Sequence, residues 1–457
     1  MTTTPPPHAS LTMRRVVTTW WPLAASWLLM GLELPALSAI VARMANPEVN
    51  LAAYGGVVSP LALIIESPII MLLAASTALS RDWASYVKMR RFMMRASALL
   101  TVLHVLVAFT PLYYVVVGGL IGAPAEVIEP ARLGLMILVP WTWSIAYRRF
   151  NQGVLIRFGH SRSVGLGTLI RLSSNGLVLL AGYLLNVTPS IVMAASAVAT
   201  GVVCEAIYVG WRVQPVLRRQ LRPAPTVEPA LTYRAFCAFY VPLALTSLLA
   251  LLLQPLGSAA LSRMPNALES LAVWTVVSGL VFMVRSLGVA YNEVVVSLLD
   301  EPGAVRALRR FAALLTVLTT ALLVILAATP LSALWFEGVS ALSPALAALA
   351  GLGLWLTLPM PALSTMQSWY QGALVHGRRT RGITEAVAIF LLVSSVVLGA
   401  GVVWGQVPGL YIGLAAFGLG MLVQTAWLWV RSRPVVRAAQ ARDAGVAPLQ
   451  PADASAP

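Results

Sequence analysis

Long apolar runs, separated by short polar segments, follow one another along the whole chain. Each run is close to the roughly 20 residues that an α-helix needs to cross the hydrocarbon core of a bilayer. The pattern therefore predicts an all-α membrane protein with twelve transmembrane helices. They are expected at residues 16–42, 51–79, 94–120, 132–156, 164–185, 189–213, 235–262, 268–298, 311–335, 345–375, 383–404 and 408–430.

Arginine and lysine gather in every second segment between these runs. They follow the second, fourth, sixth, eighth, tenth and twelfth runs, and the opposite loops hold few of them. Those opposite loops carry the acidic residues Glu48, Glu126, Glu129, Glu269 and Glu337. Loops rich in basic residues stay on the cytoplasmic side. We therefore predict a multi-pass protein of the cell membrane with both termini in the cytoplasm.

Composition supports the membrane assignment. The chain is 59% hydrophobic and 10% charged, whereas a soluble domain carries about 25% charged residues. The net charge of +15 comes from the loop arginines, so membrane topology accounts for it and no nucleic-acid partner is predicted. Cys204 and Cys237 provide neither a disulfide framework nor metal spacing. We predict no cofactor and no metal.

The chain also lacks the motifs of soluble enzymes. It has no phosphate-binding glycine-rich loop with lysine, no HExxH and no CxxC pair. We therefore predict that it is not an enzyme. An intramembrane lipid-modifying enzyme that used Glu66 and His104 is an outside alternative, but it would leave the internal repeat unexplained.

The sequence repeats itself at about half its length. Most of the matching residues lie 219 positions apart, and those in the first helix of each half lie 220 apart. The pairs include Pro22 with Pro242, Pro35 with Pro255, Ser59 with Ser278, Arg90 with Arg309, Pro140 with Pro359, Gln152 with Gln371 and Arg162 with Arg381. Six helices per half give both halves one topology, so an axis along the membrane normal should relate them. A binding site is then expected near mid-membrane between the halves.

These features divide the chain into five parts. The first is a short polar cytoplasmic tail, and the two lobes are joined by a Pro-rich polar linker. The last part is rich in Ala, Pro and Gln, and is expected to be disordered. The predicted bounds are 1–15 for the tail, 16–213 for the N-lobe, 214–232 for the cytoplasmic linker, 233–431 for the C-lobe and 432–457 for the disordered cytoplasmic tail.

Three short stretches carry a resemblance to a known superfamily. They are Trp21-Pro22-Leu23, Leu51-Ala52-Ala53-Tyr54-Gly55 and Gly153-Val154-Leu155-Ile156, the last followed by a basic turn. With the two six-helix halves and their Pro-bearing first helices, the chain resembles the multidrug/oligosaccharidyl-lipid/polysaccharide (MOP) exporter superfamily. That superfamily includes the MATE drug exporters and lipid-linked oligosaccharide flippases. Within it the chain most resembles the progressive ankylosis protein family, and the likeness in architecture covers nearly all of it.

The resemblance implies a V-shaped exporter that works by alternating access. Likeness to the progressive ankylosis proteins implies export of an organic anion such as citrate, a nucleotide or pyrophosphate. Proton- and sodium-driven drug exporters of the superfamily carry an acidic constellation for ion coupling, whereas the first helix here holds only Glu33.

Several charged residues fall inside the predicted helices, where an uncompensated charge costs roughly 2.5–3.5 kcal/mol. Glu66 and Arg285 occupy equivalent positions in the two halves, 219 residues apart. We predict that they form an ion pair between the lobes that closes one state, or alternatively a permanent packing pair. Glu33 lies beside Pro35, and as a coupling residue it would bind and release a proton. A neighbouring helix could instead satisfy it.

Polar residues also form stripes along several of the apolar helices, and such stripes normally face a bundle interior or a wet cavity. The candidate substrate-binding residues are Trp141, Arg148, Asn151, Arg171, Asn175, Arg285, Asn292, Gln367 and Gln371. Arginine outnumbers glutamate among them, and its planar fork suits a carboxylate or a phosphate. Alternatively, Arg148 belongs to the cytoplasmic interface and snorkels to lipid phosphates. Glu205 is expected near the cytoplasm, paired with a loop arginine.

The sequence thus predicts a monomeric secondary transporter that exports a small organic anion or phosphate-bearing solute. Its expected partners are that solute, membrane lipid and a coupling proton or sodium ion. A flippase for a lipid-linked precursor is the first alternative, and would need a lateral opening and a long apolar groove. A proton- or sodium-coupled multidrug exporter is the second, and would need an acidic cavity poor in arginine.

Overall fold

The computed structural model describes residues 11–186, 188–377 and 379–444, and this part of the chain is helical without strands. Within it, ten helices are long and apolar enough to span a membrane, and the bent pair α16 and α17 adds an eleventh. The pair α7 and α8 is the counterpart of that bent pair in the first half. Its α8 is more polar because it carries Arg148, Arg149, Asn151 and Gln152. Twelve spanning segments result, as predicted.

The first six segments form the N-lobe. They are α1 (Met13–Val41), the chain of α2 (Pro47–Ala52), η1 (Ala53–Val58), α3 (Ser59–Ile70) and α4 (Leu72–Leu79), then α5 (Trp83–Phe109), α7 (Ala125–Ile137) with α8 (Val139–Arg157), α9 (Ser161–Leu184), and α10 (Ser190–Val216) with η3 (Leu217–Leu221). The short α6 (Leu112–Tyr114) and η2 (Val115–Ile121) connect the third and fourth segments.

The C-lobe repeats this order. Its segments are α11 (Tyr233–Leu261), α12 (Ala267–Val289) with α13 (Tyr291–Leu298), α14 (Ala304–Ala328), α16 (Pro344–Leu356) with α17 (Met360–His376), α18 (Arg381–Trp404) and α19 (Gly409–Asp443). Between α14 and α16 lie α15 (Leu331–Ala333) and η4 (Leu334–Val339). The axes of α16 and α17 differ by 42° at the break between them.

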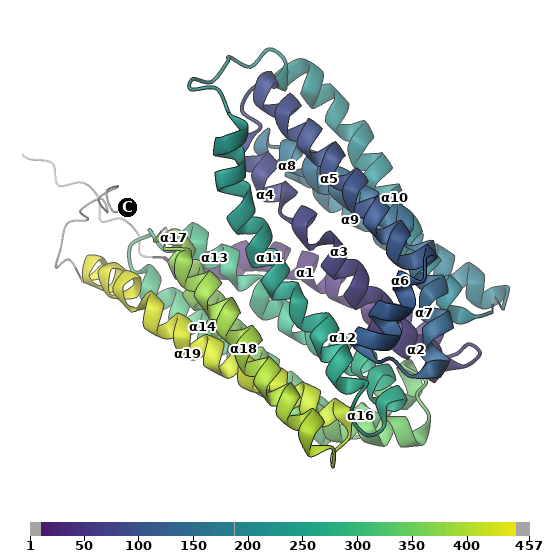
Figure 1. Cartoon of the computed structure of the whole chain (residues 1–457). Helices are drawn as coiled ribbons and strands as arrows, with labels where there is room; N and C mark the ends of the chain where they lie inside the picture. The colour runs from purple at the N-terminus through teal and green to yellow at the C-terminus, as the bar shows by residue number, and fades with distance from the viewer. Residues whose placement is uncertain (1–10, 187, 378, 445–457) are drawn as a thin grey trace, which may run out of the picture.

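The two lobes form a V. Figure 1 shows them meeting where α2, α12 and α16 lie and diverging away from that end. Tight packing explains the junction, because a Cβ on Gly55 of η1 would come within 1.7 Å of Thr275 Oγ1 on α12. Only a glycine at position 55 leaves room for the side chain of Thr275.

Two equivalent arginines fasten the same junction. Arg43, just after α1, donates hydrogen bonds to the carbonyls of Gly338 and Val339 in η4 of the opposite lobe. Arg263, 220 residues later, donates to the carbonyls of Ile121 at 2.6 Å and Leu120 at 2.7 Å in the N-lobe. Each lobe thus holds the other through the same contact, as a pseudo-twofold axis requires.

At the diverging end, the first helix of each lobe contacts the other lobe. Trp20 of α1 donates its indole N–H to the carbonyl of Leu287 at 3.0 Å. In the reciprocal contact, the hydroxyl of Tyr240 on α11 donates to the carbonyl of Pro68. The ring of Phe236 packs edge-on against that of Phe92, with the ring centroids 4.8 Å apart. These crossing helices connect the lobes where the rest of the bundles diverge.

Two predicted boundaries are wrong. The linker was expected to begin at residue 214, but α10 and η3 continue the helix to Leu221. The tail was expected to be disordered from residue 432, but α19 runs to Asp443. Residues 432–443 are rich in alanine and arginine, which favour helix, and buried Val436 and Ala439 pack in a core cluster with α13 and α14. The rest of the expected tail, residues 445–457, lies outside the described residues.

The remaining linker rests on the N-lobe. The N–H of Val227 donates to the Asp82 carboxylate at 3.0 Å, and Lys88 donates to the carbonyl of Leu231 at 2.6 Å. Asp82 also caps α5 through the N–H of Ser85 at 2.8 Å. Burial raises the pKa of the Asp82 carboxyl, but these hydrogen bonds lower it more, so its pKa lies below the ordinary value.

Candidate functional site

A network of charged side chains crosses the interior of the N-lobe. Glu205 on α10 accepts hydrogen bonds from Arg148 at 2.6 Å and from Gln152 at 2.9 Å, both on α8. Its carboxylate also lies 3.6 Å from Nε of Arg171 on α9. Arg171 in turn pairs with Glu33 of α1 at 3.1 Å, and Asn175 donates to Glu33 at 2.6 Å. We call these residues the N-lobe charge network.

The charges in this network balance. Glu33 and Glu205 face Arg148 and Arg171, and the side chain of Glu205 is 0% exposed while that of Arg148 is 7% exposed. A charge so deep in a membrane protein needs a partner, and here each arginine has one. Arg148 and Arg171 are therefore already neutralised. Glu205 holds both arginines in this conformation, and a role for them in binding substrate stays a prediction.

One alternative and one prediction for this region are wrong. Arg148 is buried in the lobe and does not snorkel to the cytoplasmic interface. Glu205 was expected to pair with a loop arginine, yet it is the centre of the network. The sequence offers a weak signal for Glu205: it is the single acidic residue of α10, and a spanning helix rarely keeps one without a partner.

Glu66 and Arg285 form no ion pair in this conformation of the described chain, so the predicted pair, which was expected to close one state, stays a prediction for another conformation. Glu66 is 2% exposed, and the charges acting on it are those of Arg148 and Arg149 in its own lobe. Its Oε1 atom has no hydrogen-bond partner among the described residues. The helices explain this, because α3 packs against α11 and α8, whereas α12 packs against α1, α2 and η1. Equivalent residues meet only where they lie close to the axis.

A cavity of about 220 Å³ lies between the lobes, and Arg285 lines it. The repeat-equivalent serines Ser59 and Ser278 line it from opposite lobes, and Gln254 and Trp274 add further polar contacts from the C-lobe. We call this space the interlobe cavity. It lies where the repeat predicts a site.

Arg285 is a cation without a counterion. Its Nε atom is buried and has no hydrogen-bond partner, and it forms no ion pair within the described ranges. Arg285 as a whole is half-buried, and an anionic ligand would supply the counterion that its guanidinium lacks. Of the predicted substrate arginines, Arg285 alone lines the interlobe cavity as the structure describes it.

The other predicted residues are dispersed. Gln367 donates to Gln424 and Thr425 of α19, each at 3.1 Å, and so holds two helices of the C-lobe together. Asn151 donates to the carbonyl of Tyr147 in its own helix. Trp141 is buried in the N-lobe with its indole N–H lacking a partner in the described chain. Asn292 and Gln371 are half-buried and are not among the residues that line the interlobe cavity.

Sequence reasoning missed Gln254 and Trp274. A signal for Gln254 exists, since it is a polar residue inside an apolar helix, next to the repeated Pro255. Ser59 and Ser278 were recognised as a repeat pair, but not as site residues.

Within the described residues, no group of three or more His, Cys, Asp or Glu side chains could hold a metal ion.

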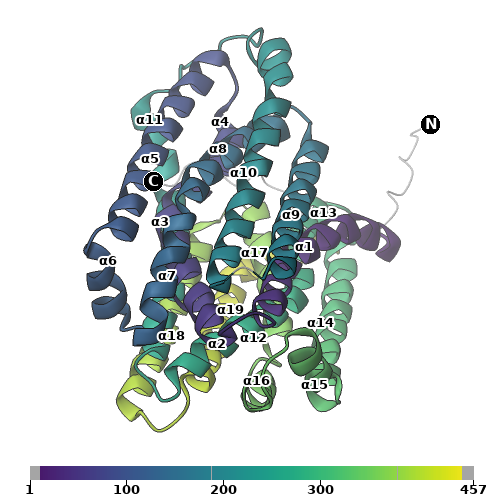
Figure 2. The same ribbon diagram turned by 90° about the vertical axis from the view of Figure 1, so that its right-hand side faces the viewer.

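A second cavity, of about 290 Å³, opens between α1, α9 and α10 of the N-lobe. Figure 2 shows α1 and α9 side by side on this face, and the two helices are in contact. Glu33 and Asn175 lie in its wall, and exposed leucines such as Leu29, Leu32 and Leu169 surround them. We call this space the lateral groove.

Comparison with solved structures places this arrangement among known folds. An inward-facing structure of a multidrug resistance MATE family transporter of the MOP superfamily superposes with a TM-score of 0.69 over 92% of this chain and 98% of the other, at 15% identity. The chain has the MATE transporter fold. No protein-family profile matches the sequence, and no curated protein matches it in sequence.

Two further structures with this fold are informative. A MOP superfamily transporter from Pyrococcus furiosus, described as having a binding pocket of reverse polarity, matches with a TM-score of 0.62 at 14% identity over 95% of this chain and 97% of the other. The lipid II flippase MurJ, in an inward closed conformation, matches with a TM-score of 0.60 at 14% identity over 92% and 91% of the two chains. The superfamily resemblance seen in the sequence therefore holds at the level of the fold.

Proposed function

We propose that this protein is a secondary transporter of the cell membrane that exports a small organic anion or phosphate-bearing solute by alternating access. The unpaired Arg285 in the interlobe cavity carries this proposal. Around the guanidinium, Ser59, Ser278 and Gln254 offer hydroxyl and amide groups to the remaining oxygens of an anion. The two lobes would rock about the junction at Gly55 and Thr275.

The charge of the interlobe cavity argues against a cationic drug as substrate. Arg285 is the one ionisable residue among those that line it in the described chain. A positive cavity repels a cation and attracts an anion. A pocket of reverse polarity has been described for the Pyrococcus furiosus transporter with the same fold. Progressive ankylosis proteins offer candidate solutes: citrate, nucleotides and pyrophosphate.

A thermal-stability scan of the purified full chain tests this proposal. The compounds are citrate, nucleotides, pyrophosphate, lipid-linked precursors and cationic dyes, since a ligand that binds the folded state raises the Tm. We expect an anion to raise the Tm of the wild type. The Arg285→Gln variant should bind it on the order of 100-fold more weakly, because a buried charge contact is lost.

Arg234→Gln is the matched control, since it removes an exposed arginine of the same lobe that forms no ion pair with the described residues and does not line the interlobe cavity. It should bind the anion as the wild type does. A cationic dye that stabilises the protein while every anion fails would contradict the proposal. So would an anion whose binding is unchanged in Arg285→Gln.

We further propose that Glu33 couples transport to a proton. Its side chain is 20% exposed, lies in the wall of the lateral groove and pairs with Arg171. Protonation would cancel the Glu33 charge and leave Arg171 with Glu205 as its remaining partner. The balance of the N-lobe charge network then becomes positive by one charge, which favours an anion nearby.

Uptake into vesicles under an imposed pH gradient tests this coupling. We expect uptake by the Glu33→Gln variant to respond to the gradient about tenfold less than uptake by the wild type, a difference of about 1.4 kcal/mol. Glu337→Gln, an exposed glutamate in η4, is the control and should respond as the wild type does. An unchanged pH response in Glu33→Gln would remove Glu33 from the mechanism.

The lateral groove favours a second candidate, a flippase for a lipid-linked anionic precursor. Its apolar wall could hold a lipid tail, while the amide of Asn175 could donate to an oxygen of the head group. The lipid II flippase MurJ shares the fold. Stabilisation by lipid-linked precursors, together with no response to any soluble anion, would favour this function over export of a soluble solute.

A further inference from the structure

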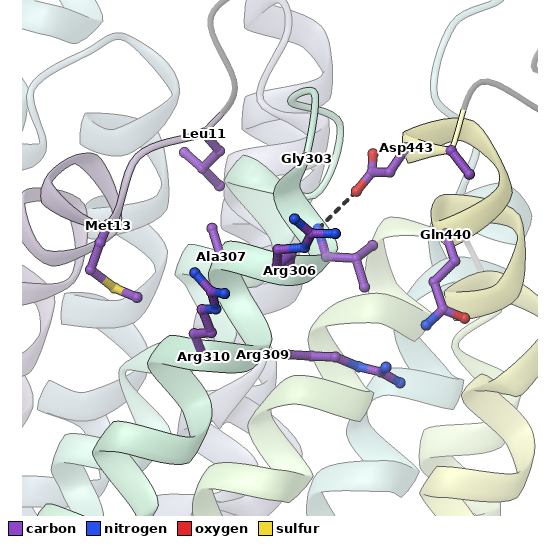
Figure 3. A pocket seen from close by; sticks show the side chains of 11 residues that line it. Leu11, Met13, Gly303, Arg306, Ala307, Arg309, Arg310, Gln440 and Asp443 are labelled. Carbon is purple, nitrogen blue, oxygen red and sulfur yellow. Dashed lines mark hydrogen bonds between the residues drawn. The ribbon is translucent and has the colours of Figure 1, made fainter.

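A cavity of about 780 Å³ lies where α14 begins, and it shares no residue with the interlobe cavity or the lateral groove. Three separate parts of the chain build it: the segment before and at the start of α1, the first turns of α14, and the last turn of α19. Figure 3 shows Arg306, Arg309 and Arg310 of α14 around this space, with Met13 and Gln440 on opposite sides. We call it the basic cavity.

The three arginines carry uncompensated charge. They occupy positions i, i+3 and i+4 of α14, which places them on neighbouring parts of one helical surface. All three are exposed, and none forms an ion pair with residues 11–186, 188–377 or 379–444. The one carboxylate in the wall, Asp443, already accepts from the N–H of Val305 at 3.0 Å and pairs with Arg442 at 3.2 Å. The basic cavity is therefore strongly positive.

The position of the basic cavity indicates which anion it would receive. The arginines occupy the first two turns of a spanning helix, and the apolar part of α14 begins directly after them at Phe311. They thus lie at the level where phospholipid head groups meet water on the cytoplasmic side. Leu11 and Met13 give the same cavity an apolar wall. A basic pocket with an apolar flank at this height suits a lipid phosphate with its glycerol and upper acyl chain.

We propose that the basic cavity binds the head group of an anionic phospholipid, with its phosphate held by Arg306, Arg309 and Arg310. Guanidinium forks bind phosphate oxygens in a bidentate manner, and three of them can share one head group. The lipid would also fasten α1 to the C-lobe. The N–H of Leu11 already donates to the carbonyl of Pro302 at 2.8 Å, and Arg15 pairs with Glu301 at 2.7 Å beside the cavity.

The experiment measures binding of short-chain phosphatidylglycerol to the purified full chain by its effect on the Tm. Phosphatidylcholine of the same chain length tests the need for net negative charge, while inorganic phosphate and glycerol 3-phosphate test whether a soluble phosphate suffices. The variant Arg306→Gln/Arg309→Gln/Arg310→Gln should bind phosphatidylglycerol about 100-fold more weakly, at about 1 kcal/mol for each arginine.

The matched control is Arg90→Gln/Arg91→Gln/Arg95→Gln on α5, which removes the same charge from the equivalent helix of the N-lobe, where all three arginines are exposed. It should retain wild-type affinity. Equal losses in both variants, no preference over phosphatidylcholine, or binding of glycerol 3-phosphate as tight as that of the lipid would each overturn the proposal. In the wild type, a photoactivatable phosphatidylglycerol should label residues near Met13 or Gln440. Labelling confined to other regions would also overturn it.

Discussion

Replacing Glu205 by glutamine is expected to lower the free energy of unfolding by about 3–5 kcal/mol, because it removes one member of a buried ion pair and leaves the other uncompensated. Glu205 is fully buried and contacts Arg148, Gln152 and Arg171. Glutamine keeps the size of the side chain, so the loss measures charge and not packing. Unfolding of the purified variant in mixed micelles gives the difference from the wild type.

A second variant separates the uncompensated charge from other effects of the substitution. In Glu205→Gln/Arg148→Met the unpaired cation is also removed, while Arg171 keeps its pair with Glu33. Most of the lost stability should return. The control is Glu385→Gln in α18, which breaks more exposed pairs with Arg381 and Arg431 and should cost no more than about 1 kcal/mol. Equal effects of Glu205→Gln and Glu385→Gln would show that the N-lobe charge network does not stabilise the lobe.

Placing a methyl group on Gly55 is expected to open the junction between the lobes. The added Cβ would lie 1.7 Å from Thr275 Oγ1 and 2.7 Å from Thr275 Cβ, so η1 and α12 must separate. Overpacking of this kind costs about 1–3 kcal/mol. The clash exists only where these helices touch. Gly55→Ala should therefore shift the equilibrium between this conformation and one with the junction open toward the open one, by roughly 10- to 100-fold. Accessibility of a cysteine introduced at the junction reports that shift.

Two variants make this result specific. Gly55→Ala/Thr275→Gly removes the clashing side chain and should restore much of the wild-type population. Gly118→Ala adds the same methyl group in η2, where nothing lies within 4 Å of the new Cβ, and should have no effect on the equilibrium. A wild-type accessibility pattern in Gly55→Ala would mean that the lobes do not turn about this contact.

The helices and their duplication could be predicted because both leave a pattern in the sequence itself. Apolar length identifies a spanning segment, and equivalent residues such as Ser59 and Ser278 reveal the repeat. The same argument does not bring Glu66 and Arg285 together in this conformation. Equivalence under a pseudo-twofold axis says nothing about distance from that axis, and α3 and α12 have different neighbours.

The ion-pair partners inside a lobe could not be predicted from the sequence either. Whether Arg148 reaches Glu205 depends on how α8 and α10 are rotated about their own axes, and many polar stripes allow more than one rotation. The extension of α19 was missed because its composition was read as that of a disordered tail. Val436 and Ala439 find partners only once α13 and α14 are folded beside them.

The most direct test of the central claim is the distance between the diverging ends of the two lobes while an anion occupies the interlobe cavity. Spin labels at Arg162 and Arg381, an equivalent and exposed pair, would report it once Cys204 and Cys237 are replaced. An anion that stabilises the wild type should shift the distribution of distances, and the same anion should leave Arg285→Gln unchanged. An identical response in both proteins, or no response in the wild type, would contradict a transporter whose lobes move around an anion held by Arg285.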